Sequence, residues 1–210
     1  MRAEPAVKRC IAYFDGQNLF HAARDAFGYT FPNYDPLKLV QALCSFQVWQ
    51  LVETRFYTGV PDAMDKPDWS HFWEAKLAVM GSRGIVTYSR PLRYRNQKIN
   101  YPDGSSATMT VGQEKGIDVR IALDVVRHSL DNRYDVALIF SQDQDFSEAV
   151  DDVRKISALN DRWIKVACAF PVSPAAPPQR GINGCDWIRI DRRVYDSCID
   201  PNDYRKRPPS

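Results

Sequence analysis

Two aspartates between a strand and a helix are the residues best suited to chemistry. They stand in the run Phe140-Ser-Gln-Asp-Gln-Asp-Phe146. The apolar run 134–140 predicts a buried strand, and residues 146–159 predict an amphipathic helix. Asp143 and Asp145 therefore follow the carboxyl end of a strand, where open α/β sheets bind ligands. Two carboxylates repel an anion, so the pair favours a cation.

A third aspartate is expected at an equivalent position near the start of the chain. Residues 9–14 form a short apolar run that predicts a strand, and apolar residues recur at helical spacing over 19–27. Asp15 then lies at the tip of this strand, with Gly16 in the turn. Asn18 falls in the first helical turn and is expected to face back toward Asp15.

The helix predicted from residue 117 adds a fourth aspartate. Asp118 lies in its first turn, and Asp124 six residues later is rotated by roughly 120°, so the two cannot face one point. Asp118 is the better placed for the site. The alternative is that Asp118 serves only as a favourable partner of the helix dipole.

Acids from three separate segments would then meet at one sheet edge: Asp15, Asp118, Asp143 and Asp145. Crowded carboxylates raise one another's pKa values unless a cation neutralises them. Oxygen ligands without His or Cys select Mg²⁺ or Mn²⁺, and these ions also bind substrate phosphate. Phosphodiester hydrolysis is the chemistry that such a site favours. Neither G-x-x-x-x-G-K-[ST] nor G-x-G-x-x-G follows a strand, which argues against a nucleotide-phosphate cradle.

Positive charge is interleaved with an aromatic ring in the middle of the chain. Residues 84–95 predict a strand, with a hairpin turn at Asn96-Gln97 and further turn residues over 101–106. The residues that suit phosphates and a stacked base are Arg90, Arg93, Tyr94, Arg95 and Lys98. The alternative is a solvated edge ribbon protected by charge. Lys115 or Arg120 could also contact a phosphate.

Strands that alternate with helices predict an α/β fold with a mainly parallel central sheet flanked by helices. Further helices are expected over 35–44 and 68–81, further strands over 48–60, 163–170 and 186–190, and an extended proline-rich connector over 171–178. We expect one domain over 9–199, with a basic β-hairpin inserted in it. Residues 200–210 are expected to form a basic, disordered tail.

The composition of the chain restricts its class, its location and its partners. The 210 residues are 44% hydrophobic and 26% charged, with a net charge of +2, so any nucleic-acid surface must be local. Five scattered cysteines favour reduced thiols and hence a cytoplasmic location. No segment approaches the roughly 18 apolar residues of a membrane span, so no membrane partner is expected. Homo-oligomerisation stays open.

The sequence resembles the NYN domain family, whose PIN-like fold is that of metal-dependent ribonucleases. Three blocks in order carry the resemblance, which covers about residues 9–170: Phe14-Asp-Gly-Gln-Asn18, Glu114-Lys-Gly-Ile-Asp118-Val with Ala122-Leu-Asp124, and Phe140-Ser-Gln-Asp-Gln-Asp-Phe146. It implies that Asp15, Asp118 and Asp143 bind metal and that Asp145 is a fourth acid. It further implies that Asn18 is a polar helper and that Ser141 is the small hydroxyl beside the acids. Family members more usually read Ser-Gly-Asp-Ser-Asp-Phe in the third block, so Gln142 and Gln144 depart from the pattern.

Three functions remain. The first is an endoribonuclease that uses Mg²⁺ or Mn²⁺ and binds RNA along the basic ribbon. The second is a non-catalytic RNA-binding or partner-binding module on the same fold, which the two glutamines motivate. The third is another phosphoryl-transfer enzyme, toprim-like or phosphatase-like. The toprim pattern wants Glu where the chain has Asp15, and the phosphatase pattern wants Asp-x-Asp where it has Asp15-Gly-Gln17.

Overall fold

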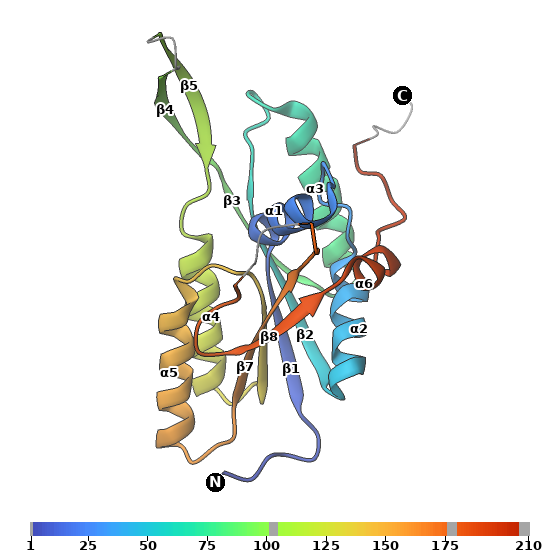
Figure 1. The fold of residues 1–210 in the computed structure, drawn as a ribbon, viewed down its shortest axis with the longest axis vertical. Coiled ribbons are helices and arrows are strands. Elements are labelled where there is room, and N and C mark those ends of the chain that lie inside the picture. Colours follow the sequence, from blue (N-terminus) through green and yellow to red (C-terminus); the bar gives the residue numbers. More distant parts are fainter. Residues whose placement is uncertain (1, 101–104, 176–179, 206–210) are drawn as a thin grey trace.

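A six-stranded sheet forms the centre of the computed structural model, which describes residues 2–100, 105–175 and 180–205. Its strands follow the order β3-β2-β1-β6-β7-β8, and every neighbouring pair is parallel (Figure 1). The predicted parallel α/β class is thus confirmed. The strands are β1 (Arg9–Asp15), β2 (Gln50–Val60), β3 (Val86–Pro91), β6 (Val136–Phe140), β7 (Lys165–Pro171) and β8 (Asp186–Ile190).

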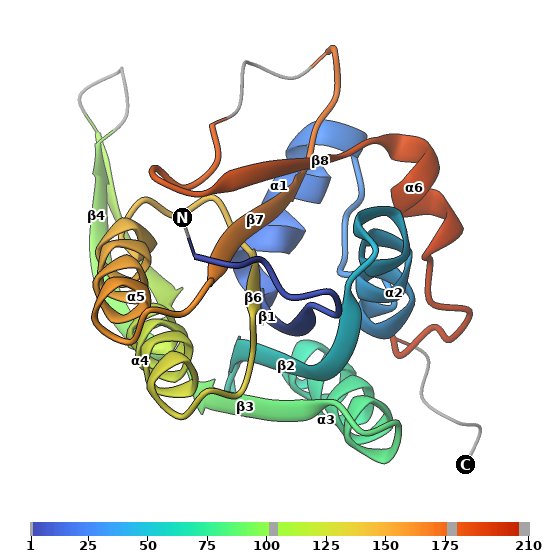
Figure 2. The same ribbon diagram turned by 90° about the horizontal axis from the view of Figure 1, so that it is seen from below.

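Helices cover both faces of this sheet, as the view from below shows (Figure 2). Strand β1 explains why both faces are apolar: Cys10, Ala12 and Phe14 pack into one hydrophobic cluster, while Ile11 and Tyr13 pack into the other. One face carries α4 (Ile117–Leu130) and α5 (Phe146–Leu159). The other carries α1 (Gly16–Phe27), α2 (Pro36–Gln47), α3 (Pro67–Ser82) and α6 (Arg192–Ser197).

Local capping chemistry fixes where two of these helices begin. Asp15 caps α1 by accepting a hydrogen bond from the Asn18 amide. Asp35 caps α2 by accepting from two amides of its first turn, and Pro36 takes the first helical position. The first helix therefore starts at the tip of β1, and its amino end faces the carboxyl edge of the sheet.

The inserted hairpin differs in detail from its prediction. It consists of β4 (Arg93–Asn100) and β5 (Ser106–Gln113), which pair antiparallel and project from the body (Figure 1). The predicted turn at Asn96-Gln97 is wrong, because these residues pair with Thr110 and Met109 inside the ribbon. The predicted strand over 84–95 is also two strands, β3 and β4, separated at Leu92. Of the turn expected over 101–106, residues 101–104 lie outside the described part.

The end of the chain also differs from its prediction. Asp200 accepts a hydrogen bond from the buried Lys76 ammonium at 3.2 Å, and Tyr204 is buried against the core. Residues 200–205 therefore pack on α3 instead of forming the start of a disordered tail. Residues 206–210 of that expected tail, and 176–179 of the proline-rich connector and its flank, lie outside the described residues.

Candidate functional site

Asp15 is the buried centre of the acidic group. Its side chain is 7% exposed and accepts two hydrogen bonds. The Asn18 amide donates to Oδ1 at 3.0 Å, and the Ser141 hydroxyl donates to Oδ2 at 3.3 Å. Because Ser141 follows β6, these contacts tie the ends of two neighbouring strands together.

The loop after β6 presents two acids in sequence. The Asp143 amide donates to the Ser141 hydroxyl at 3.2 Å, and the Asp145 amide donates to Asp143 Oδ1 at 3.0 Å. Asn18 adds a second tie, since its Oδ1 accepts from the Gln142 amide at 3.0 Å. Asp143 is thus held beside Asp15, whereas Asp145 is exposed on the outer side of the loop.

Glu114 joins this edge, although no sequence pattern predicted a site residue there. Its Oε2 accepts a hydrogen bond from the Gly59 amide of β2 at 2.9 Å. A Cβ atom on Gly59 would lie 2.9 Å from that same oxygen, so the close approach needs glycine. The one signal in the sequence is that Glu114 opens the block that leads to Asp118.

Electrostatics show that these acids act on one another. Burial raises the pKa of Asp15 to about 6, and the carboxylates of Asp143 and Asp118 add to the rise, against hydrogen bonds that lower it. Burial likewise raises the pKa of Glu114 to about 8, with Asp15 and Asp118 contributing. Four carboxylates from three segments therefore share one negative field, which a cation would relieve.

The donor chemistry fits a hard divalent cation. Asp15, Asp118 and Asp143 supply carboxylate oxygens, the ligands that Mg²⁺ and Mn²⁺ prefer, and could hold such an ion. In the described part of the chain, no group of three or more His, Cys, Asp or Glu side chains stands in the arrangement of a formed metal site. Two hollows flank the acids. One of about 520 Å³ lies between α4 and α5 and includes Asp118 and Asp145, and another of about 470 Å³ includes Asn18 and Asp143.

Arg90 lies beside this edge. Its Nε donates to the Tyr88 hydroxyl at 2.7 Å, and its guanidinium lies 5.6 Å from the centre of the Tyr88 ring. Gly116, at the amino end of α4, has a φ of 77°, and a Cβ atom there would lie 2.7 Å from an Arg90 nitrogen. The exposed Arg90 side chain therefore packs against the turn that leads into Asp118.

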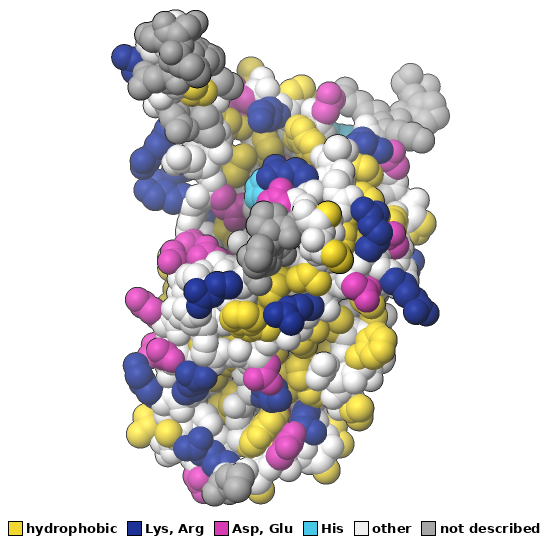
Figure 3. All heavy atoms as spheres, viewed as in Figure 1, with side chains coloured by type: hydrophobic (Ala, Val, Ile, Leu, Met, Phe, Trp, Pro, Cys, Tyr) yellow, Lys and Arg dark blue, Asp and Glu magenta, His cyan; other side chains and the backbone are white. Residues whose placement is uncertain are grey.

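The hairpin carries the other predicted RNA contacts. Arg93, Arg95 and Lys98 are exposed, and none has a carboxylate within 4.0 Å among the described residues. Basic side chains gather along the hairpin at the upper left of Figure 3. Strand alternation places Arg93 and Arg95 on one face of the ribbon, and Tyr94 and Lys98 on the other. The Tyr94 hydroxyl accepts from the Asp62 amide at 3.1 Å.

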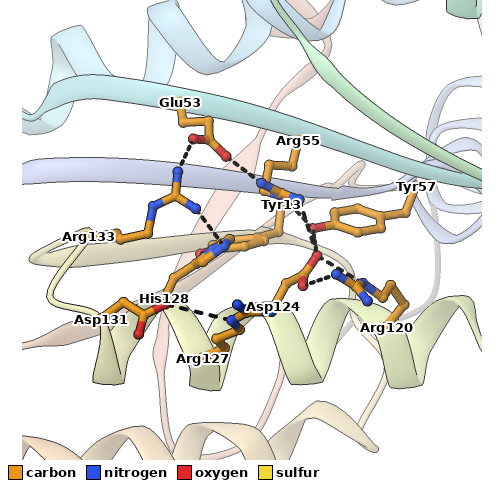
Figure 4. A network of polar contacts seen from close by, with 10 residues as sticks. All are labelled: Tyr13, Glu53, Arg55, Tyr57, Arg120, Asp124, Arg127, His128, Asp131 and Arg133. Atoms are coloured by element: carbon orange, nitrogen blue, oxygen red, sulfur yellow. Dashed lines mark hydrogen bonds and ion pairs between the residues drawn. The ribbon is translucent and has the colours of Figure 1, made fainter.

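Lys115 and Arg120 have different surroundings. Lys115 is exposed beside Glu114. Arg120 is engaged, because its guanidinium pairs with Asp124 at 2.7 Å (Figure 4). It also lies 5.4 Å from the centre of the Tyr88 ring. Asp124 is 2% exposed and is engaged by Tyr57 and Arg55 of β2.

Comparison with known proteins bears on this arrangement. The chain matches the NYN domain over residues 10–158. A crystal structure of a protein of unknown function from Vibrio parahaemolyticus is similar, with a TM-score of 0.56 and 20% identity, over 90% of this chain and 97% of that one. Ribokinase from Giardia lamblia gives a TM-score of 0.35 at 11% identity, covering 83% and 54% of the two chains, which is too weak to support an inference. No curated protein matches the chain.

The NYN match runs from β1 through α5 and includes all four aspartates as well as Glu114. It covers well over half of the chain and agrees with the parallel α/β sheet and with the acids at its carboxyl edge. The chain belongs to the NYN domain family, a family of PIN-like nucleases.

Proposed function

We propose that this protein is a metal-dependent endoribonuclease that hydrolyses RNA phosphodiester bonds. The observation that carries the proposal is the convergence of Asp15, Glu114, Asp118 and Asp143 on one sheet edge, with the pKa values of Asp15 and Glu114 raised. Such a concentration of negative charge suits a divalent cation and its phosphate substrate. Membership of the NYN family supports the same chemistry.

The four aspartates, Asn18 and Ser141 each receive a role in this proposal. Asp15, Asp118 and Asp143 would hold Mg²⁺ or Mn²⁺, and Asp145 would hold a second ion or orient water. An ion held by these residues would supply positive charge to polarise the scissile phosphate. Asn18 and Ser141 hold the ends of β1 and β6 together, because both donate to Asp15 and Asn18 also accepts from the Gln142 amide of the Asp143 loop.

The RNA strand would approach along the hairpin. Arg93, Arg95 and Lys98 offer positive charge to successive phosphates, and Tyr94 offers a ring to a base. Arg90 lies between the hairpin and the amino end of α4, so it would contact the phosphate nearest the acids. Lys115 completes the proposed contacts, whereas Ser141, which is 1% exposed and donates to Asp15, would act through that carboxylate and not by touching the RNA. Arg120 would act on RNA binding only indirectly, because its guanidinium is paired with Asp124. It packs against the Tyr88 ring, which Arg90 also contacts, and would so help to hold Arg90 in place.

Purified protein incubated with single-stranded RNA and Mg²⁺ or Mn²⁺ tests the proposal. Cleavage should stop with EDTA. It should fall by more than about 100-fold in Asp15→Asn and Asp143→Asn, since residues that merely support metal ligands are worth about 10–100-fold. Asp131→Asn, an exposed aspartate at the far end of α4, serves as the control and should cleave normally. Equal cleavage by wild type and Asp143→Asn would refute the proposal.

A second candidate is a non-catalytic RNA-binding module. The observation in its favour is that the described acids do not stand in the arrangement of a formed metal site. It requires RNA affinity that is independent of metal, survives Asp143→Asn and weakens with salt. Turnover that disappears with EDTA would exclude it.

We also propose that the protein works in the cytoplasm. The support is that all five cysteines are free, as expected in a reducing compartment. No helix in the described ranges is both long and apolar enough to cross a membrane.

A further inference from the structure

Gln142 and Gln144, the two departures from the usual family pattern, reach across to a distant segment of the chain. Gln144 Nε2 donates to the Gly181 carbonyl at 2.9 Å, and its Oε1 accepts from the Asn183 amide at 3.1 Å. Gln142 Nε2 donates to the Arg180 carbonyl at 3.0 Å. The two side chains thus pair with three backbone groups within four residues, an arrangement we name the glutamine clasp.

The segment held by the clasp, residues 180–183, is itself fixed to the sheet. Ile182 is fully buried, and its amide donates to the Cys168 sulfur of β7 at 3.3 Å. A Cβ atom at Gly181 would lie 2.6 Å from the same sulfur and 2.7 Å from the Phe170 ring, so the backbone packs tightly on β7. Packing on β7 therefore fixes the backbone of residues 180–183, to which the two glutamine side chains bond.

Asp143 stands between the two glutamines. On one side, the loop is tied to α1, because the Gln142 amide donates to Asn18 Oδ1. On the other side, the clasp ties it to residues 180–183, and Gln144 Nε2 also donates back to the Gln142 carbonyl at 3.1 Å. A small side chain at position 144 could not span the distance to Gly181 and Asn183. The segment also lies beyond the part of the chain that matches the NYN domain, which ends at residue 158.

We propose that Gln142 and Gln144 are positioning residues, which hold the Asp143 loop against residues 180–183 so that its carboxylate can receive a divalent cation. This inference rests on the proposed function. Residues outside the NYN match thereby become part of the site.

Mn²⁺ binding and amide exchange test the clasp without reference to turnover. Two variants remove the two contacts that Gln144 contributes to the clasp: Gln144→Met keeps the size of the side chain, and Gln144→Ser restores the residue usual in the family. We expect both to weaken Mn²⁺ binding by about tenfold, measured by calorimetry. The Asn183 amide should exchange at least about tenfold faster, because its acceptor is removed. Gln41→Met, an exposed glutamine on α2, is the matched control, and the melting temperature shows that each variant is folded.

The outcomes separate the clasp from the proposed function. Faster exchange at Asn183 with unchanged Mn²⁺ affinity would overturn the positioning role, and unchanged exchange would overturn the clasp itself. Cleavage of RNA by wild type alongside either result would leave the proposed function standing. Wild-type protein that binds no Mn²⁺ would overturn the proposed function, and the inference with it.

Discussion

Asp124 shows how the chain places a carboxylate for structure instead of for the site. It accepts hydrogen bonds from the Tyr57 hydroxyl at 2.7 Å and from the guanidinium groups of Arg55 and Arg120. Figure 4 shows this group continuing from Arg55 to Glu53. Because all partners lie between β2 and α4, the network fixes α4, and with it Asp118, against the sheet.

We predict that Asp124→Ala destabilises the protein by about 1–3 kcal/mol, because the variant leaves the buried Tyr57 hydroxyl without its acceptor, while Arg55 keeps its ion pair with Glu53. Urea unfolding of wild type and variant measures the difference. Asp131→Ala, at the exposed end of the same helix, should cost no more than about 0.5 kcal/mol. A loss below about 1 kcal/mol for Asp124→Ala would contradict the prediction.

Because the pKa of Glu114 is raised, we expect the stability of the protein to depend on pH. The pKa of this carboxyl group is raised to about 8 from an ordinary 4.5, so its favourable contribution is complete below pH 4.5 and is lost as the pH rises to 8. Wild type in EDTA should therefore lose more stability between pH 5.5 and 8.5 than Glu114→Gln does, by about 1–3 kcal/mol. The glutamine keeps an acceptor for the Gly59 amide. Urea unfolding at both pH values measures this, with the exposed Glu148→Gln as control, and parallel losses in wild type and Glu114→Gln would refute it.

The acids differ in how well the sequence alone predicts that they belong to the site. Asp15 and Asp143 follow apolar runs that end in a turn, and that local pattern marks the tip of a strand in any α/β sheet. Glu114 lies outside every predicted element, and its contact with Gly59 joins residues 55 positions apart. No local pattern encodes such a contact, since it depends on where β2 lies relative to α4.

At the scale of the elements, the hairpin is expected to act as an electrostatic arm. We predict that replacing both Arg93 and Arg95 by Ala weakens RNA binding to a similar degree for all sequences, because the residues would contact phosphates. The slope of log K against log salt should also fall by about 0.7 for each phosphate of a single strand that the variant no longer neutralises. Fluorescence anisotropy over a salt series measures both effects.

A matched control separates the effect of the hairpin's charges from the effect of removing any exposed positive charge. Lys155→Ala removes an exposed charge on α5 that pairs with Asp152, and it should change neither affinity nor slope. If the double variant binds RNA with the slope of wild type, the ribbon is a solvated edge and its charges protect it from aggregation.

The hairpin was also the element least open to sequence prediction. Residues 106–113 read Ser-Ala-Thr-Met-Thr-Val-Gly-Gln, in which apolar residues alternate with threonine over 107–111 only, so the strand signal is short and contains few large apolar residues. Their strand exists because β4 pairs with it, from Arg93 with Gln113 to Asn100 with Ser106. The helices after Asp35 and Gly116 could be predicted from the sequence, because helix caps and apolar spacing are local patterns.

At the scale of the whole molecule, the segment after β7 belongs to the same sheet as the NYN match. Strand β8 pairs parallel with β7, and Ile190 and Tyr195 are fully buried. The Asp35 amide donates to the Cys198 carbonyl at 2.8 Å, which joins α6 to the start of α2. The sequence predicted β8 from its apolar pattern, but the packing of residues 200–205 depends on Lys76, which lies far away in the chain.

We predict that a chain ending at Val172 does not fold stably. It would expose the surface that β8 and α6 cover, where each large buried side chain is worth about 1.5–3 kcal/mol. It would also leave the Lys76 ammonium, which is 1% exposed, without Asp200. Together these losses approach the whole stability of a typical domain, about 5–15 kcal/mol. Circular dichroism and urea unfolding of the shortened chain measure this, and a cooperative transition near that of the full chain would show that residues 10–158 fold without the C-terminal segment.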